Sequence, residues 1–255
     1  MTDRDIAAFY DAFRDTRMQR YRRFGNARLR AANRFVIRGL RRTDRVLEVG
    51  CGIGMTTGSL AKRVRRGHVY ALDISPRNVE LASQLVRRDN VTWRVVDVLA
   101  DPGSLAKWVA EPVDRIVLVD VYEHIPTLQR EALMAALVTV MDDTAEVRLT
   151  FPTVEYQEHL RVHDPEELQP VDEDVTAGDL EQLGAKFGFR LTFWSRRDVW
   201  LTEQYVHATL RRGTVLTPRG IRAYPKLHGF LKQLADRARP AAARVSHRAR
   251  RSSGR

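Results

Sequence analysis

The chain has 255 residues and a single cysteine, Cys51, which excludes an intramolecular disulfide and a cysteine metal cluster. A chain of this length can form one α/β domain with attachments and needs no disulfide support. Its formal charge of +11 is unevenly spread, because residues 211–255 carry +12 and the rest of the chain carries −1. The basic character therefore belongs to the C-terminal end.

Neither a signal peptide nor a membrane span is predicted. The first residues are charged and lead into no long apolar run, and no apolar stretch approaches the ~20 residues that cross a bilayer. Together with the lack of disulfides, this favours a reduced, cytoplasmic setting.

The first predicted elements are helices. Apolar residues recur at helical intervals between Ile6 and Ile37, and Gly25-Asn26 interrupts the pattern. We therefore expect one helix to end and another to begin at this dipeptide.

A strand, a glycine turn and a helix follow between residues 45 and 64. A short aliphatic run, typical of a buried strand, precedes three glycines at alternate positions: Val46, Leu47 and Val49, then Gly50, Gly52 and Gly54. The helix is expected to begin near Met55. Such glycines let the backbone adopt positive φ and let a ligand approach closely, and a helix N-terminus favours an anionic group.

The spacing of these glycines differs from the dinucleotide fingerprint. In G-x-G-x-x-G the third glycine would fall at position 55, which is Met55, whereas this chain has Gly54. Glu48, inside the end of the strand, suits a cationic ligand group better than a pyrophosphate. By itself, the glycine turn is also consistent with an ordinary tight connection.

The next strand, residues 69–72, ends in Asp73, 19 residues after Gly54. An acid at about this distance meets the two hydroxyls of a ribose. With these residues the chain resembles the class I S-adenosylmethionine-dependent methyltransferases, whose signature is E/D-x-G-x-G-x-G after the first strand and an acid at the end of the second. The resemblance extends over about residues 45–211.

The resemblance implies a doubly wound, Rossmann-like α/β sheet of seven strands with a C-terminal antiparallel hairpin. The expected parts are an N-terminal helical lid at residues 1–42, an S-adenosylmethionine-binding methyltransferase domain at 43–212 with a substrate-cap insertion at 152–175, and a basic, partly disordered tail at 213–255. Tyr10 and Tyr21 of the lid would touch the methionine part of the cofactor or pack the lid on the body.

The resemblance also implies which residues bind S-adenosyl-L-methionine. Asp73 corresponds to the ribose acid, and Asp97, after a third strand at residues 91–96, corresponds to the acid that hydrogen-bonds the adenine amino group. A surface role is the alternative for Asp97. The full implied set is Glu48, Gly50, Cys51, Gly52, Gly54, Asp73, Ile74, Asp97, Val98 and Asp120.

The chemistry is expected at the end of a fourth strand, residues 115–119. Asp120 ends it, and the following Glu123-His124-Ile125-Pro126 is similar to a sequence in many small-molecule members of the family. His124 is the predicted general base, since an imidazole with a pKa near ~6.5 can take a hydroxyl proton at neutral pH. Alternatively, His124 caps the next helix or packs on the sheet, and His159 or Tyr156 of the cap insertion is the base.

Two missing motifs favour a metal-independent enzyme that acts on a small molecule. The D/N-P-P-Y/F motif of enzymes that methylate exocyclic base amines is absent. Pro152-Thr153 follows the fifth strand, residues 146–151, where metal-dependent catechol-type enzymes have Asp-Asn. The cap insertion holds His159 and His163, four residues apart, but no tight metal-binding spacing on a clear apolar helix, and no metal is predicted.

A helix, two strands and the basic tail complete the chain. Thr176 is expected to cap a helix that Gly188 ends, and residues 190–195 and 205–210 form the last hairpin. Residues 237–255 lack apolar periodicity and are expected to be dispensable for chemistry. They would bind nucleic acid or an anionic membrane surface weakly, although a GC-rich coding bias explains their arginines equally well.

The sequence thus predicts methyl transfer from S-adenosylmethionine to a small organic acceptor, with the hydroxyl oxygen of a secondary metabolite, sugar or lipid-like molecule as the favoured target. One alternative is an RNA or tRNA methyltransferase that uses the basic tail. Another is a non-catalytic binding module that keeps the cofactor fold. The nearly neutral body and the missing amine motif disfavour nucleic acid, and no oligomeric state is predicted.

Overall fold

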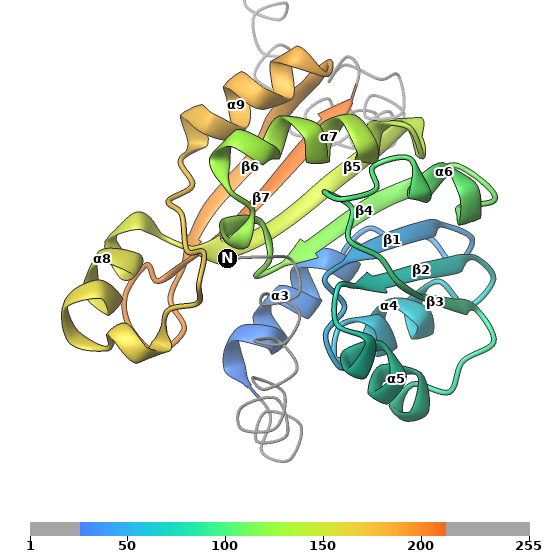
Figure 1. Ribbon diagram of the computed structural model, residues 1–255, viewed down its shortest axis with the longest axis horizontal. Helices are drawn as coiled ribbons and strands as arrows, with labels where there is room; N and C mark the ends of the chain where they lie inside the picture. The colour runs from blue at the N-terminus through green and yellow to red at the C-terminus, as the bar shows by residue number, and fades with distance from the viewer. Residues whose placement is uncertain (1–25, 213–255) are drawn as a thin grey trace, which may run out of the picture. The chain divides into compact units, whose positions relative to one another are not determined.

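The computed structural model describes residues 26–212, which form a seven-stranded sheet with helices on both faces (Figure 1). The strand order is β3-β2-β1-β4-β5-β7-β6, in which the pairs from β3 to β5 are parallel and the pairs of β7 are antiparallel. The strands are β1 (Arg45–Val49), β2 (His68–Asp73), β3 (Val91–Val95), β4 (Val113–Val119), β5 (Met141–Pro152), β6 (Phe189–Arg197) and β7 (Tyr205–Arg212). The predicted α/β sheet with a C-terminal antiparallel hairpin is confirmed.

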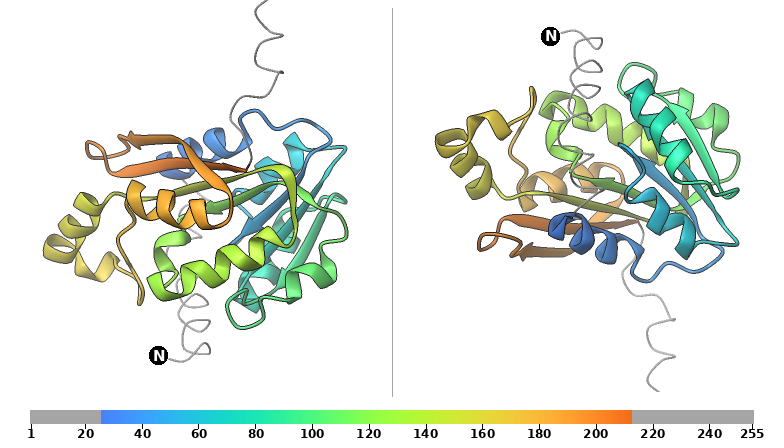
Figure 2. Two further views of the ribbon diagram at one scale, coloured as in Figure 1. Left: turned by 90° about the horizontal axis from the view of Figure 1, so that it is seen from above. Right: turned by 90° about the horizontal axis from the view of Figure 1, so that it is seen from below.

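Helices cover the two faces of the sheet. They are α3 (Ala27–Ile37), α4 (Thr57–Arg63), α5 (Pro76–Leu85), α6 (Ser104–Trp108), α7 (Arg130–Val138) and α9 (Ala177–Lys186), whereas α8 (Val154–His163) lies beyond the end of β5. Residues of α3, α4 and α5 pack on one face, and those of α6, α7 and α9 pack on the other. Figure 2 shows α3 on the face opposite α7 and α9.

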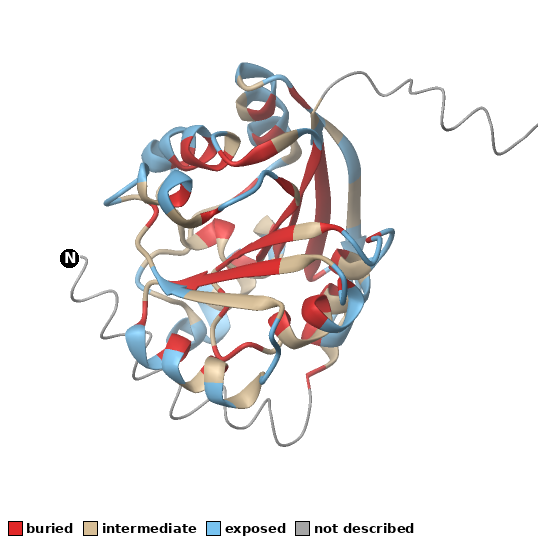
Figure 3. Ribbon diagram, turned by 90° about the vertical axis from the view of Figure 1, so that its right-hand side faces the viewer, coloured by how far each residue is buried: buried red, intermediate tan, exposed pale blue. Residues whose placement is uncertain are grey.

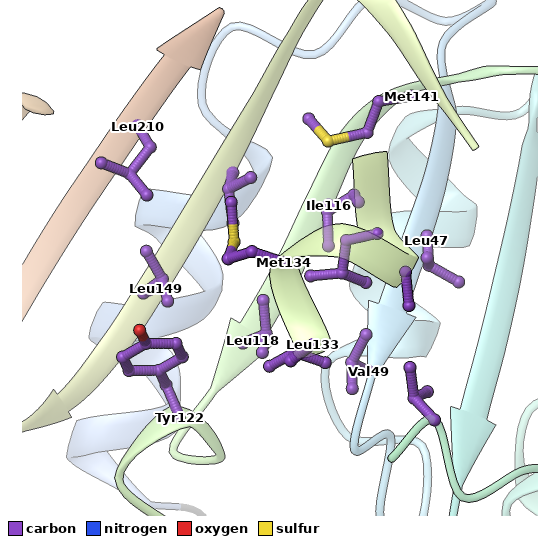
Figure 4. Packing of buried hydrophobic residues seen from close by; sticks show 14 of the residues in the cluster. Leu47, Val49, Ile116, Leu118, Tyr122, Leu133, Met134, Met141, Leu149 and Leu210 are labelled. Carbon is purple, nitrogen blue, oxygen red and sulfur yellow. The ribbon is translucent and has the colours of Figure 1, made fainter. Parts of the chain in front are cut away.

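Successive side chains of the central strands point to opposite faces of the sheet, so each face has its own hydrophobic core. Ile116 and Leu118 of β4 join the core under α7, whereas Val117 between them packs with Val36 of α3. Figure 4 shows Leu133 of α7 beside Leu118 of β4. In Figure 3 the central strands are buried along most of their length. Strands buried on both faces read as continuous aliphatic runs, which is why these strands are recognisable in the sequence.

A buried ion network holds the C-terminal end of α3 on the sheet. Arg115 of β4 donates to the carbonyl of Val36 at 2.8 Å, and Arg148 of β5 donates to the carbonyl of Phe35. Glu146 pairs with both guanidinium groups. Because the last carbonyls of a helix lack partners within the helix, the two arginines satisfy groups that would otherwise be buried unpaired.

The aromatic ring of Phe35 gives α3 a second anchor. It stacks on the imidazole of His207 in β7, with ring centroids 4.7 Å apart. Burial, with a smaller effect of the Arg197 charge, lowers the pKa of His207 to about 4. The imidazole is therefore neutral at neutral pH in the folded protein.

Some elements differ from those expected. α4 begins at Thr57 rather than near Met55, because the glycine loop takes a further turn before the helix starts. The short helix α6 and the cap helix α8 were not anticipated. α8 lacks a clear apolar stripe, so its sequence reads as a solvated insertion, yet Thr153 caps it by accepting the N–H of Tyr156 at 3.3 Å.

The predictions for the two ends of the chain lie outside the described residues. Residues 1–25 include most of the expected lid with Tyr10 and Tyr21, and residues 213–255 include the whole expected tail. The expected start of the second N-terminal helix is confirmed, since the Asn26 side chain caps α3 by accepting the N–H of Leu29.

Replacing His207 by Gln removes its titration and keeps a polar side chain. Above pH ~6.5 neither the folded nor the unfolded wild type protonates this imidazole. Between pH ~6.5 and about 4 the unfolded chain binds a proton that the folded protein excludes, which lowers the free energy of unfolding by up to ~3 kcal/mol.

We therefore expect His207→Gln to lose less stability than the wild type when urea unfolding is compared at neutral pH and near pH ~4.5. His163→Gln, which alters an exposed histidine, should retain the wild-type pH dependence. Equal acid destabilisation of His207→Gln and the wild type would show that His207 is not buried as a neutral group.

Candidate active site

Four acidic side chains share the carboxyl edge of the parallel strands. Glu48 lies near the end of β1 and Asp73 ends β2, while Asp97 follows β3 and Asp120 follows β4. These strands are adjacent and parallel, so their carboxyl ends meet at one edge, where open α/β sheets bind ligands. The structure thus brings together the acids that the sequence indicated.

The loop between β1 and α4 lies against the turn that follows β4. Gly50, Gly52 and Gly54 have φ values of 73°, 50° and 81°, which residues with a side chain rarely adopt. A Cβ on Gly50 would lie only 2.4 Å from Cγ2 of Val121. Glycine at position 50 is therefore required both by the backbone conformation and by the close approach of the two segments.

Asp73 links this glycine loop to the end of β2. Its Oδ2 accepts the N–H of Gly52 at 2.7 Å, and its Oδ1 accepts the N–H of Ser75 at 2.9 Å. Ser75 in turn caps α5 by accepting the N–H of Asn78. The carboxylate is therefore held in one orientation beside the loop, with Ile74 half-buried next to it.

Glu48 and Cys51 are buried beside the loop. The Glu48 carboxylate accepts the hydroxyl of Thr57 at 2.6 Å. Burial raises the pKa of Glu48 to about 8, although the hydrogen bond from Thr57 opposes the shift. Burial also raises the pKa of the Cys51 thiol, which packs in the core under α3 and α4. Glu48 thus fixes the first turn of α4 on β1.

Asp97 and Val98 follow β3 in a tight turn. Oδ1 of Asp97 accepts the N–H of Leu99 at 2.9 Å and that of Ala100 at 3.2 Å, whereas Val98 is part of the core. These bonds hold the Asp97 carboxylate at the end of the strand next to that of Asp73.

Asp120 has a strained backbone conformation at the end of β4, with a φ of 54°. Its Oδ1 accepts the hydroxyl of Thr150 at 3.0 Å, and its Oδ2 lies 2.8 Å from Nη1 of Arg28. The Arg28 guanidinium, from the first turn of α3, also lies 5.4 Å from the ring centroid of Tyr205. Sequence reasoning missed Arg28 and Tyr205, because no motif marks them and only tertiary packing brings them to this edge.

His124, the predicted general base, is held between carboxyl groups. Its Nδ1 lies 2.8 Å from the carbonyl oxygen of Val171 and 3.2 Å from Oδ1 of Asp172, and its Nε2 lies 3.8 Å from Oε1 of Glu123. Burial by itself lowers the pKa of His124, but Glu123 and Asp172 outweigh it and raise the pKa to about 9. A protonated imidazole cannot take a hydroxyl proton, so His124 would have to lose this proton before it could act as the base.

The other two predicted catalytic residues lie on α8. The Tyr156 ring lies 5.7 Å from that of Tyr205, which places it near Arg28. His159, almost one turn further along, stacks on His163 with centroids 4.3 Å apart. The ring nitrogens of His159 have no hydrogen-bond partner among residues 26–212, and within this range no group of three His, Cys, Asp or Glu side chains could hold a metal ion.

The carboxyl edge suits a ligand that carries hydroxyls and positive charge. Carboxylates accept hydrogen bonds from hydroxyl and amino groups, whereas a pyrophosphate beside Asp73, Asp97 and Asp120 would be repelled. S-adenosylmethionine presents ribose hydroxyls, amino groups and a sulfonium ion, and it carries no phosphate. The residues present therefore fit the cofactor that the sequence resemblance implies.

Comparisons with known proteins match the central part of the chain. Residues 46–144 match a family model described as a methyltransferase domain. A protein-L-isoaspartate O-methyltransferase from Ignicoccus hospitalis is 34% identical over 99 residues, which are 38% of this chain and 44% of that protein. A ribosomal RNA small subunit methyltransferase A from Rubrobacter xylanophilus is 32% identical over 135 residues, which are 49% of this chain and 51% of that protein.

This chain therefore spans about half the length or less of the curated relatives it matches. Among solved structures, magnesium protoporphyrin IX methyltransferase from Synechocystis with bound SAH is similar, with a TM-score of 0.58 and 19% identity over 81% of this chain and 99% of that one. At 19% identity, this structural similarity establishes the fold alone.

In residues 26–212 there is no helix of the length and apolar character that a membrane crossing needs.

Gly50→Ala tests the contact between the glycine loop and the turn after β4. The new methyl group would clash with Val121, and the positive φ would be strained, so we expect the free energy of unfolding to fall by ~2 kcal/mol or more in urea unfolding. The double variant Gly50→Ala/Val121→Ala should recover the part of the lost free energy of unfolding that is due to the clash.

Gly103→Ala is a matched control, since its φ is −75° and the nearest atom to a new Cβ there is a side-chain oxygen of Asp101 at 3.7 Å. We expect it to stay within ~0.5 kcal/mol of the wild type. Wild-type stability of Gly50→Ala would mean that the two segments do not approach each other this closely.

Proposed function

We propose that the chain is a class I S-adenosylmethionine-dependent methyltransferase and that it methylates a hydroxyl oxygen of a small organic acceptor without a metal ion. The observation that carries the proposal is the set of acids beside the glycine loop at the carboxyl edge of the sheet. In this proposal Asp73 accepts the ribose hydroxyls, Asp97 accepts the adenine amino group, and Asp120 lies at the methionine end.

S-adenosylmethionine, when bound, supplies a methyl group on a positively charged sulfur whose departure leaves a neutral sulfide. The protein therefore has to align the acceptor oxygen with this methyl group and to exclude water. Tyr156 of α8 is half-buried and packs on the buried Tyr205 at the start of β7, next to the Arg28–Asp120 pair, so that its ring provides an aromatic surface for the acceptor.

His159 is the proposed general base for the hydroxyl proton. It lies almost one turn from Tyr156 on α8, and its ring nitrogens are free of hydrogen bonds within residues 26–212, so that one of them is available to take a proton. His124, which carries a proton already, is the weaker candidate.

A second candidate function is RNA methylation. It is favoured by the similarity to the ribosomal RNA methyltransferase and by the charge of +12 in residues 211–255. A panel that presents ribosomal RNA and small hydroxylated compounds with labelled S-adenosylmethionine separates the two. Label in RNA that is lost on deleting residues 237–255 would replace the small-molecule proposal.

Asp73→Asn tests the cofactor assignment. The amide retains an oxygen for the N–H of Ser75 but loses the negative charge and the acceptor for the N–H of Gly52, so both the ribose hydroxyls and the glycine loop lose a partner. We expect binding of S-adenosylhomocysteine, measured by calorimetry, to weaken by ~1–3 kcal/mol. Asp89→Asn changes an exposed acid and should bind as the wild type does. A wild type without measurable binding would refute the proposed cofactor.

His159→Gln tests the base. General-base loss lowers rates by ~10²–10⁴, so kcat on an accepted hydroxyl compound should fall by that factor while the affinity for S-adenosylhomocysteine stays unchanged. Glu158→Gln, on the same helix and exposed, is the matched control and should turn over normally. Near-normal kcat in His159→Gln would mean that alignment alone carries the reaction or that another residue takes the proton.

A further inference from the structure

The segment of residues 168–175, which we call the latch, connects the turn η4 (Pro165–Glu167) to α9 and lies on the turn η2 (Tyr122–His124) after β4 (Figure 1). Nδ1 of His124 lies 2.8 Å from the carbonyl oxygen of Val171 and 3.2 Å from Oδ1 of Asp172. The N–H of Glu173 donates to the carbonyl of Glu123 at 2.9 Å. Both the backbone and the side chains of η2 thus hold the latch.

A second group of contacts holds the end of the latch. Oε2 of Glu173 accepts the N–H of Thr127 at 2.6 Å. Arg130, at the start of α7, donates to the carbonyl of Asp174 at 3.1 Å and to that of Ile125 at 3.0 Å. These bonds join the latch to the chain on the far side of η2.

The latch is also bound to the cap helix. Arg161 of α8 donates to Oδ1 of Asp174 at 2.7 Å and to the side-chain oxygen of Gln157 at 3.2 Å. Gln157 is buried and lies next to Tyr156 in sequence, on the helix that carries the proposed acceptor residues. The position of α8 is therefore linked through the latch to the turn after β4.

The centre of this arrangement is charged although it is buried. The side chains of His124 and Asp172 are 10% and 12% exposed, and that of Glu123 is 2% exposed. Burying charges is unfavourable unless they are paired, and removing one partner leaves the other uncompensated. The ion pair thus makes the seating of the latch sensitive to single changes at residue 124 or 172.

We propose that the His124–Asp172 pair seats the latch and so places α8 over the acceptor site, which makes His124 a positioning residue. The placement of α8 over an acceptor site rests on the proposed function, because only a methyl-transferring enzyme has such a site. Its structural half, that the pair holds residues 168–175 on η2, is independent of any chemistry.

The decisive variants are Asp172→Asn and His124→Gln. Asn retains an oxygen for the N–H of Gln169, which Asp172 accepts at 2.6 Å, but presents no charge to His124. Gln at position 124 retains a donor for the Val171 carbonyl and removes the positive charge. Glu158→Gln, on the exposed side of α8, is the matched control.

Amide hydrogen exchange measured by mass spectrometry reports on the latch directly. We expect peptides within residues 168–175 to exchange about tenfold faster in both variants, the factor that corresponds to ~1.4 kcal/mol, while peptides of β1 and β4 exchange as in the wild type. The double variant should exchange no faster than the faster single variant, because both changes remove one interaction. Glu158→Gln should match the wild type throughout.

Binding and turnover separate positioning from catalysis. With an accepted compound, we expect both variants to raise KM about tenfold, to lower kcat by less than that, and to leave the affinity for S-adenosylhomocysteine unchanged. If His124 were the base, kcat would fall by ~10²–10⁴ in His124→Gln while amide exchange of the latch stayed as in the wild type. The fall in kcat would then be smaller in Asp172→Asn.

Unchanged exchange of the latch in both variants overturns the proposal. Faster exchange with an unchanged KM overturns its positioning half. If the wild type binds no S-adenosylhomocysteine and methylates nothing, while the latch responds as expected, the proposed function fails and the seating of the latch stands.

Discussion

The close approach of the glycine loop to the turn after β4 is the constraint on which the site depends. β1 and β4 are neighbours in the sheet, so the segments that leave their carboxyl ends compete for the same space. Gly50 resolves the competition because it carries no side chain where Val121 packs. From the other side, Asp73 holds the loop through the N–H of Gly52. The loop is thus fixed between two strand ends, and the turn that carries Asp120 and His124 is fixed with it.

Buried charged groups have two different roles in this molecule. Under α3, Arg115, Glu146 and Arg148 form a network of both signs that satisfies helix carbonyls, and it lies away from the carboxyl edge. At the carboxyl edge the charged groups are mainly acids, and burial raises the pKa of Glu48 to about 8. A shifted pKa alone therefore does not identify a catalytic residue, since Glu48 bonds to Thr57 and fixes α4.

The cap and the body of the protein are held by different forces. α7 is packed by apolar side chains such as Leu133 and Leu137, which are completely buried in the core. α8 buries one residue, Gln157, and its links to the rest of the chain are ion pairs such as Arg161–Asp174 and Glu155–Arg196, with one ring contact from Tyr156 to Tyr205. Polar links can be broken and remade at less cost than an apolar core can be opened, so the cap is the part of the site best suited to adjust to an acceptor.

The sequence by itself determined the sheet, the glycine loop and the acids at its edge. These features are local, because a strand buried on both faces is an aliphatic run, a positive φ calls for glycine, and an acid that ends a parallel strand lies at the carboxyl edge. The tertiary structure alone decided that Arg28 meets Asp120 and that Asp172 meets His124. No sequence motif contains both members of either pair, because they come from segments far apart in the chain. The protonation of His124 is undetermined by the sequence for the same reason, since it depends on the partners that packing places beside the ring.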